Sequence, residues 1–195
     1  MPPSRAGGVL VALLLFMPPV LGAQQVFPSA RVIRGTLSFD AKATAGDFTG
    51  STNAVSGEMT GGELSAVRGW VEASVKTLVT GNDRRDRDLN KSMESGKYPT
   101  IRFDVTRVEP AAGAASASGP DSVRVTLHGT FHIHGVSREA SFPATVVKSG
   151  DEVRVLATLP MNLKDYQIGG LSKILGLLKM DPAIVVHVDV TFGKS

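Results

Sequence analysis

The chain has 195 residues, of which 42% are hydrophobic and 20% charged, enough for one domain with a sizeable core but not comfortably for two. It contains no cysteine, which excludes disulfides, thiol catalysis and thiolate metal sites. The formal net charge is +3, and the one dense basic run, residues 84–88, is interleaved with acids. This run is typical of a solvated helix face, and nucleic-acid binding is not expected.

The N-terminal segment has the three-part pattern of a secretory signal peptide. Arg5 supplies a positive charge, residues 9–16 form a short apolar run, and Ala23 is a small residue at the cleavage position. The apolar run is shorter than the roughly 20 residues that a membrane-spanning helix needs. We therefore expect residues 1–23 to be a signal peptide and the protein to be periplasmic or secreted. The alternative is a retained membrane anchor.

Apolar residues of the following segment recur with a period of two, which is typical of β-strands. The clearest stretch is residues 123–134, where Leu127 and Phe131 alternate with His128 and His132. A strand of this length is more typical of a barrel than of a compact sandwich. The same pattern predicts eight strands, over about residues 33–39, 48–59, 67–78, 101–105, 123–134, 140–146, 153–161 and 184–192.

The first segment that breaks this alternation is residues 83–95, which predicts a short helix. Asp83 can cap the N-terminus of such a helix. Leu89 and Met93 are four residues apart and would share one helix face.

The second such segment is residues 169–180, where Leu171, Ile174 and Leu175 stand at helical spacing. We expect a second short helix here. It is either a plug for one end of the fold or a hydrophobic lid at a ligand portal that transiently contacts a membrane surface.

The connections between the expected strands fit an antiparallel sheet. Residues 149–151 form a tight hairpin turn, and no series of helical crossovers separates the strands. A sheet with one apolar face can close on itself, which removes its exposed edges. We predict that residues 24–195 form an all-β fold, a single eight-stranded antiparallel lipocalin-like barrel with two short helices.

Two groups of motifs resemble the YceI-like family. The central group is a Thr-Gly turn, a charged helix with an Arg-Asp pair and a Tyr-Pro strand entry: Thr80-Gly81, Arg85-Asp86, Asp88-Leu89 and residues 98–103. The hairpin at residues 129–138 is similar to that family's Gly-rich hairpin, and the resemblance extends over about residues 30–193. The chain departs from the family pattern at Leu163 and Gln167, where relatives often carry Arg and Gly. It also departs at residues 43–45 (Ala-Thr-Ala), near which relatives often carry His or Lys.

The resemblance implies a lipocalin-like, exported barrel that holds a long apolar chain, such as a polyisoprenoid or a fatty-acid derivative. It implies no catalytic residue and no cofactor. From the inward phase of the strands and the expected lid, we predict that the ligand contacts are Phe39, Val71, Phe103, Val125, Phe131, Val155 and Val186, with Leu171, Ile174 and Leu175.

Trp70 is the only tryptophan, and the alternation of its strand places it on the polar face. A bulge at Gly69 would turn its ring inward instead. Both orientations remain open from the sequence.

His128, His132 and His134 share one face of a predicted strand, and His187 would neighbour them if the barrel closed suitably. Two imidazoles two residues apart can chelate a metal, but strand alternation places them on the solvent side, and no third ligand is evident. We therefore predict no metal site. The sequence has no Gly-x-Ser-x-Gly elbow, and we predict that the protein is not an enzyme.

These observations favour an exported carrier of an apolar small molecule that is isoprenoid or fatty-acid-like. The alternatives are a structural or protein-interaction barrel with a solid core and no ligand, and a weakly metal-binding or stress-response protein that uses the histidine face.

Overall fold

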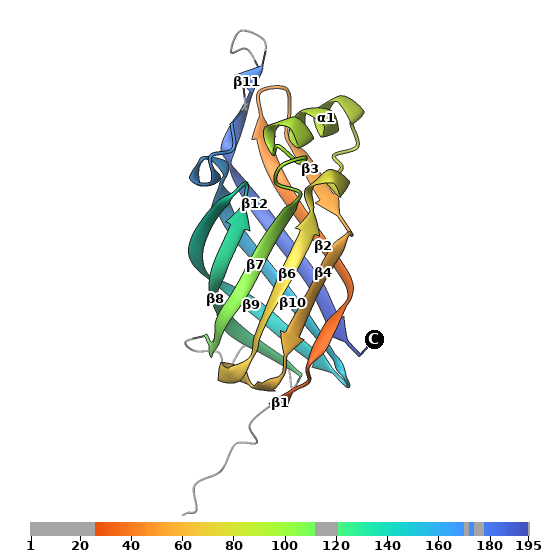
Figure 1. The fold of residues 1–195 in the computed structure, drawn as a ribbon, viewed down its shortest axis with the longest axis vertical. Coiled ribbons are helices and arrows are strands. Elements are labelled where there is room, and N and C mark those ends of the chain that lie inside the picture. Colours follow the sequence, from red (N-terminus) through yellow and green to blue (C-terminus); the bar gives the residue numbers. More distant parts are fainter. Residues whose placement is uncertain (1–25, 112–120, 170–171, 174–177, 195) are drawn as a thin grey trace, which may run out of the picture.

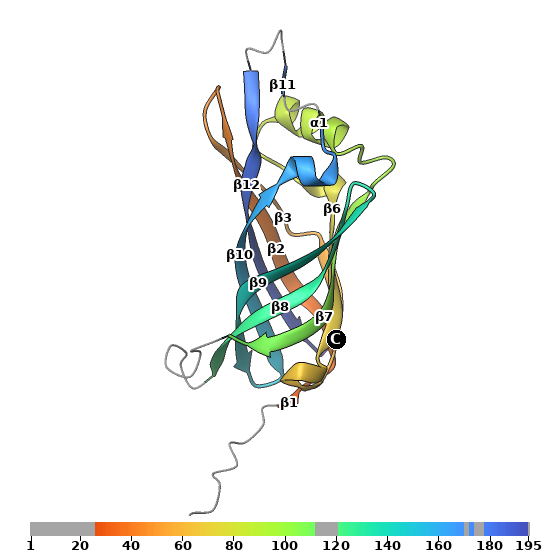
Figure 2. The ribbon, with the colours of Figure 1, turned by 90° about the vertical axis from the view of Figure 1, so that its left-hand side faces the viewer.

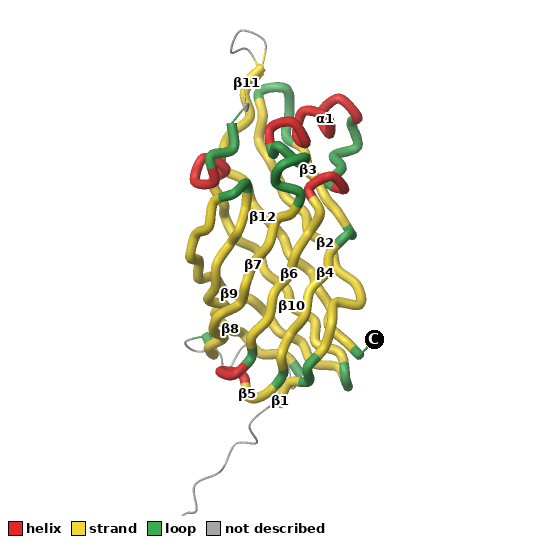
Figure 3. The backbone as a smooth tube through the Cα atoms, viewed as in Figure 1, coloured by secondary structure: helices red, strands yellow, loops and turns green. Residues whose placement is uncertain are grey.

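Eight long antiparallel strands wind around a common axis and close into a barrel (Figures 1 and 3). The computed structural model describes residues 26–111, 121–169, 172–173 and 178–194. Around the barrel the strands follow the order β2-β4-β6-β7-β8-β9-β10-β12, and β12 pairs with β2 to close the sheet. The predicted all-β, eight-stranded antiparallel barrel is confirmed.

The elements in chain order are β1 (Val26–Phe27), β2 (Ala30–Ala43), β3 (Phe48–Thr52), β4 (Val55–Thr60), β5 (Gly62–Glu63), η1 (Leu64–Ala66), β6 (Arg68–Ser74), η2 (Val75–Thr77), α1 (Asp83–Ser92), β7 (Thr100–Pro110), β8 (Ser122–Ile133), β9 (Val136–Ser149), β10 (Glu152–Asn162), η4 (Leu163–Tyr166), β11 (Ser172–Lys173) and β12 (Leu178–Gly193). The η elements are single 3₁₀ turns. Among the described residues, no helix is both long and apolar enough to cross a membrane.

The apolar phase of the strands faces the barrel interior. At the closing seam Val186 lies opposite Phe39 and Val188 opposite Leu37, so apolar side chains of the first and last strands meet inside. Because side chains alternate between the two faces of a strand, the polar phase is left on the outer wall.

The weak strand expected over residues 48–59 is two strands, separated at Asn53 and Ala54. The Thr52 hydroxyl accepts a hydrogen bond from the Ala54 backbone N–H at 3.0 Å, and Asn53 bonds Thr36 at 2.8 Å. These side-chain hydrogen bonds take the place of backbone hydrogen bonds between neighbouring strands at this point. As a result β3 pairs with the upper part of β2, whereas β4 pairs with the lower end of β2 and with β6.

The helix predicted over residues 83–95 is present as α1, and it lies at the end of the barrel opposite β1 (Figure 2). Its N-cap is Asn82 rather than Asp83, because the Asn82 side chain accepts hydrogen bonds from the backbone N–H groups of Arg84 and Arg85, both at 3.1 Å.

The second predicted helix, over residues 169–180, is wrong for the part of this segment that the structure describes. Ser172 and Lys173 pair antiparallel with Lys179 and Leu178, so β11 and the start of β12 form a ribbon beyond the barrel rim. Inter-strand hydrogen bonds that continue the long β12 satisfy this backbone in place of helical bonds. Leu171, Ile174 and Leu175, the predicted lid residues, lie outside the described residues.

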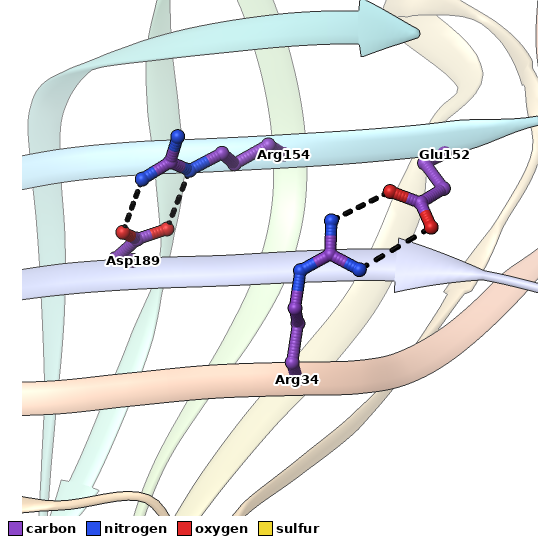
Figure 4. A network of polar contacts seen from close by, with 4 residues as sticks. All are labelled: Arg34, Glu152, Arg154 and Asp189. Atoms are coloured by element: carbon purple, nitrogen blue, oxygen red, sulfur yellow. Dashed lines mark hydrogen bonds and ion pairs between the residues drawn. The ribbon is translucent and has the colours of Figure 1, made fainter. Parts of the chain in front are cut away.

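Two bidentate ion pairs fasten the outer side of the closing seam (Figure 4). Arg34 on β2 reaches across β12 to Glu152 on β10, with donor–acceptor distances of 3.2 and 2.6 Å. Arg154 on β10 pairs with Asp189 on β12, with its Nε atom 2.8 Å from Oδ1. Together these pairs tie three neighbouring strands at the closure.

These ion pairs predict a stability that falls in acid. The hydrogen bond from Arg34 lowers the pKa of Glu152, and the one from Arg154 lowers the pKa of Asp189. A carboxyl with a lowered folded-state pKa stabilises the fold above its unfolded pKa, and this stabilisation is lost as the pH falls through the folded pKa.

We expect the double variant Glu152→Gln/Asp189→Asn to show a smaller loss of stability than the wild type between pH 7 and about pH 3. The difference should be small because the pairs are solvent-exposed. Urea denaturation at each pH measures it, with Glu139→Gln, an exposed acid outside these pairs, as the control. A pH dependence equal to that of the wild type would contradict the prediction.

Candidate functional site

The barrel interior holds two adjacent apolar cavities, which together form its bore. The lower cavity has a volume of about 130 Å³ and lies between β6, β7, β10 and β12. Val71, Phe103, Phe131 and Val155 are among the side chains that line it, and Phe27 lies at its lower end. A cavity lined in this way offers water almost no hydrogen-bond partner.

The upper cavity is larger, at about 300 Å³, and lies beneath α1. Phe39 and Val186 line its wall, and the apolar face of α1 covers it with Leu89 and Met93. Asn82 caps the helix at this rim, so a local sequence signal positions the two apolar side chains over the cavity.

The two cavities adjoin at four side chains that border both of them and that we call the neck: Leu37, Ile101, Phe131 and Val188. Phe131 belongs to an aromatic cluster, with its ring centroid 4.5 Å from that of Phe103 and 5.8 Å from that of Phe142. Gly129 makes room for this cluster, since a Cβ atom there would lie 2.6 Å from Phe103 and 2.1 Å from the Asp104 carbonyl oxygen.

Most of the sequence-predicted contact residues line this bore. Phe39 and Val186 lie in the upper cavity, Val71, Phe103 and Val155 lie in the lower one, and Phe131 borders both. Val125 is the exception. It is fully buried yet lines neither cavity, because it packs within the closed part of the core.

Among the lining residues that the prediction omitted are two pairs, of which the sequence could have indicated only the first. Leu37 and Val188 have the same inward phase as Phe39 and Val186, so the alternation would have found them. Leu89 and Met93 share a helix face, and only the docking of α1 over the barrel shows that this face borders the bore.

The family model for the YceI-like domain matches residues 32–192. This chain belongs to the YceI-like family. The match extends from β2 to the end of β12 and so covers the whole barrel. Among curated proteins, no sequence matches it.

Solved structures share the fold of this YceI-like barrel at low sequence identity. A polyisoprenoid binding domain from Saccharophagus degradans is 17% identical with a TM-score of 0.70, and the match covers 85% of this chain and 98% of that one. BcnA from Burkholderia cenocepacia is 13% identical with a TM-score of 0.66, covering 80% and 95%. A YceI protein from Campylobacter jejuni is 17% identical with a TM-score of 0.56, covering 75% and 84%.

Polar side chains of the YceI-like bore gather at its upper mouth. Arg85 and Asp88 reach this mouth from α1, Lys179 from β12 and Thr44 from the end of β2. The Arg85 guanidinium lies 4.2 Å from the centroid of the Phe48 ring. The bore is therefore mostly apolar, with charged side chains at its upper mouth and with Glu58 and Arg68 bordering the lower cavity.

Trp70 lies on the outer wall of the barrel. The pairing of β6 with both neighbouring strands runs without a register shift, so no bulge at Gly69 turns the ring inward. The Arg102 guanidinium stacks 4.4 Å from the Trp70 ring centroid. Trp70 therefore forms an exterior cation–π pair, and atoms of this residue also border the lower cavity.

Three of the four histidines lie on the outer wall, each between a hydroxyl and a carboxylate from neighbouring strands. His128 contacts Ser141 at 2.7 Å and Glu109 at 3.0 Å. The corresponding partners are Ser137 and Asp104 for His132, and Thr158 and Asp40 for His187.

These histidines are spread over the barrel wall. His187 does not neighbour the β8 histidines, because β9 and β10 separate β8 from β12. Within the described ranges, no three His, Asp or Glu side chains gather as a metal site would require.

His134 differs from the other histidines because its ring is buried at the rim, with the side chain 10% exposed. Its Nδ1 atom lies 3.0 Å from the Tyr166 carbonyl oxygen, and its ring centroid is 4.7 Å from that of Tyr98. His134, Glu94 and Gln167 are the non-glycine residues with positive φ in the described chain, and all three belong to this corner. Gln167 occupies the position where the family pattern often has glycine. Burial raises the pKa of the neighbouring Tyr166.

We expect His134→Ala to destabilise the fold by about 1–3 kcal/mol, because it removes the bond to Tyr166 and leaves a β-carbon at φ 53°. His134→Asn should be destabilised less than His134→Ala, since asparagine adopts a positive φ more readily than alanine does. Urea denaturation tests both variants, with the half-exposed His132→Ala as a surface control. Equal stability of His134→Ala and the wild type would show that this corner is not stabilising.

Proposed function

We propose that this protein is an exported carrier that holds one long apolar molecule, isoprenoid or fatty-acyl in character, along the bore of its barrel. The observation that carries this proposal is the pair of adjacent apolar cavities inside a closed barrel, which share the neck around Leu37 and Val188. A chain-like ligand fits this shape, since it can pass the neck and occupy both cavities.

The energetic argument concerns the cost of empty apolar space. Side chains that line an unfilled cavity lose dispersion contacts on one side. An alkyl or isoprenoid chain supplies these contacts and gains about 0.8 kcal/mol for each methylene that it buries. Membership of the YceI-like family and the shared fold with a polyisoprenoid binding domain support the same class of ligand.

Binding rather than catalysis is the function that this bore supports. Its described lining is apolar along most of its length, with Arg85, Asp88 and Lys179 at the upper mouth and Glu58 and Arg68 bordering the lower cavity. The alternative of a solid barrel used only for protein contacts is disfavoured by the same two cavities.

Native mass spectrometry of the mature protein, followed by organic extraction, tests the carrier function. We expect a stoichiometric apolar molecule that leaves the protein on extraction. A protein that carries none, and that also fails to bind added fatty acids or isoprenoid alcohols, would contradict the proposal.

The intact mass also tests export. A protein recovered from a bacterial periplasm or medium should begin at Gln24, since we propose cleavage after Ala23. A mass that retains residues 1–23 would favour the membrane anchor instead.

A further inference from the structure

The upper mouth of the bore contains an arginine, Arg85, that forms no ion pair with a carboxylate of the described residues. Arg85 is half-buried on α1 and lines the upper cavity. The ion pairs between described residues engage Arg31, Arg34, Arg102, Arg107 and Arg154, and none of them includes Arg85. A cation that is partly removed from water without a counter-charge is costly, so its position needs an explanation.

Thr80 holds one edge of the Arg85 guanidinium, and the Phe48 ring packs against one of its faces. Its Nε atom donates to the Thr80 hydroxyl at 2.9 Å, and that hydroxyl in turn donates to Asp86 at 2.5 Å. The guanidinium plane also lies over the Phe48 ring, which packs edge-on against Phe39 inside the cavity. The side chain is therefore preorganised before any ligand arrives.

This arrangement leaves donors of Arg85 available at the mouth. Its described hydrogen bonds use Nε and Nη2, both toward Thr80, and none uses Nη1. A guanidinium presents a planar fork of N–H groups that matches the oxygens of a carboxylate or a phosphate. Lys179 lines the same cavity and adds a second cation, and among the described lining residues Asp88 supplies a carboxylate.

We propose that the ligand of this bore carries an anionic head group, a carboxylate or a phosphate monoester, and that Arg85 binds this group at the upper mouth with Lys179 beside it. The inference rests on the proposed carrier function and adds the chemistry of the ligand's polar end. The apolar chain fills the cavities below, while the head group supplies a negative charge beside Arg85 and Lys179.

The test compares ligands with the same saturated chain and different ends: a fatty acid, the primary alcohol and the alkyl phosphate. Binding of each to the delipidated protein is measured by isothermal titration below the ligand's aggregation concentration. We expect the wild type to bind the acid or the phosphate at least about tenfold more tightly than the alcohol, as a charge-assisted hydrogen bond allows. Whichever anion shows the larger preference identifies the head-group class.

Three variants test whether Arg85 is the source of the preference for anionic ligands. Arg85→Gln should reduce the ratio of anion to alcohol affinity to about one, and Arg85→Lys should retain part of it because charge remains without the fork. Arg87→Gln is the matched control, since Arg87 is exposed on the same helix and does not line the cavity. Thermal melts establish that each variant is folded.

The possible failures are distinguishable. Equal binding of the acid, the phosphate and the alcohol by the wild type would overturn the head-group inference and leave the carrier function standing. A preference that persists in Arg85→Gln would overturn the assignment to Arg85. If none of the three ligands binds, the proposed function itself fails.

Discussion

Val188→Phe is expected to shorten the chain that the bore accepts. Val188 borders both cavities, and its neighbours on the adjoining strands are Leu37 and Ala157. A phenyl ring at this position would fill the neck between them. Ligands should then be confined to the upper cavity.

The expected effect depends on ligand length. Each methylene kept out of the bore forfeits about 0.8 kcal/mol, so exclusion of roughly four methylenes lowers the affinity on the order of 100-fold. Short ligands that occupy only the upper cavity should bind as they do to the wild type. A titration series of fatty acids of increasing length measures the break point.

The same strand offers a matched control. Val185 carries the same side chain on the outer face of β12 and is 40% exposed, so Val185→Phe adds the same ring outside the bore. We expect this variant to bind long and short chains like the wild type. If Val188→Phe lost the same affinity for short and for long chains, Val188 would not control access to the lower cavity.

Phe131→Ala is expected to destabilise the fold by about 3–5 kcal/mol, the usual cost of removing a buried phenylalanine. The Phe131 ring packs against Phe103 and Phe142, and its loss would leave a void at the neck. Urea denaturation of the delipidated protein measures this change.

A bound ligand should offset part of that loss. A ligand that binds only the folded state stabilises it in proportion to the logarithm of its concentration, and a widened neck gives a bulky apolar ligand more room. Phe131→Leu, which retains most of the apolar volume, is the control and should lose less stability than Phe131→Ala. A loss below about 1 kcal/mol in Phe131→Ala would show that the ring is not part of a packed cluster.

The C-terminal ribbon shows where sequence patterns were insufficient. Leu171, Ile174 and Leu175 stand at helical spacing, yet the described flanks of this segment pair as strands. Pro182, which follows this segment, lies within β12 at a register shift between Met180 and Ile184. Periodicity describes which side chains share a face, but long-range strand pairing decides which backbone partner is available.

The sequence by itself determined the barrel and its inner face. Period-two alternation assigns each strand residue to one of two faces, and this rule is local, so Phe39, Phe103 and Val186 could be placed inward. The Leu89–Met93 spacing and the capping signal at the start of the helix are local as well, and they made α1 predictable, although the cap is Asn82 and not the predicted Asp83.

Only the tertiary structure decided what the interior encloses. Val125 and Val188 share the inward phase, yet one packs solidly and the other faces a neck, because lumen width depends on side chains from distant strands. The sequence predicts Arg85 to be a charge on an exposed helix face. Its contacts with Thr80 and Phe48 place it at the upper mouth of the bore. Cavities and partners arise from contacts between distant segments, whereas a one-dimensional pattern records only neighbours along the chain.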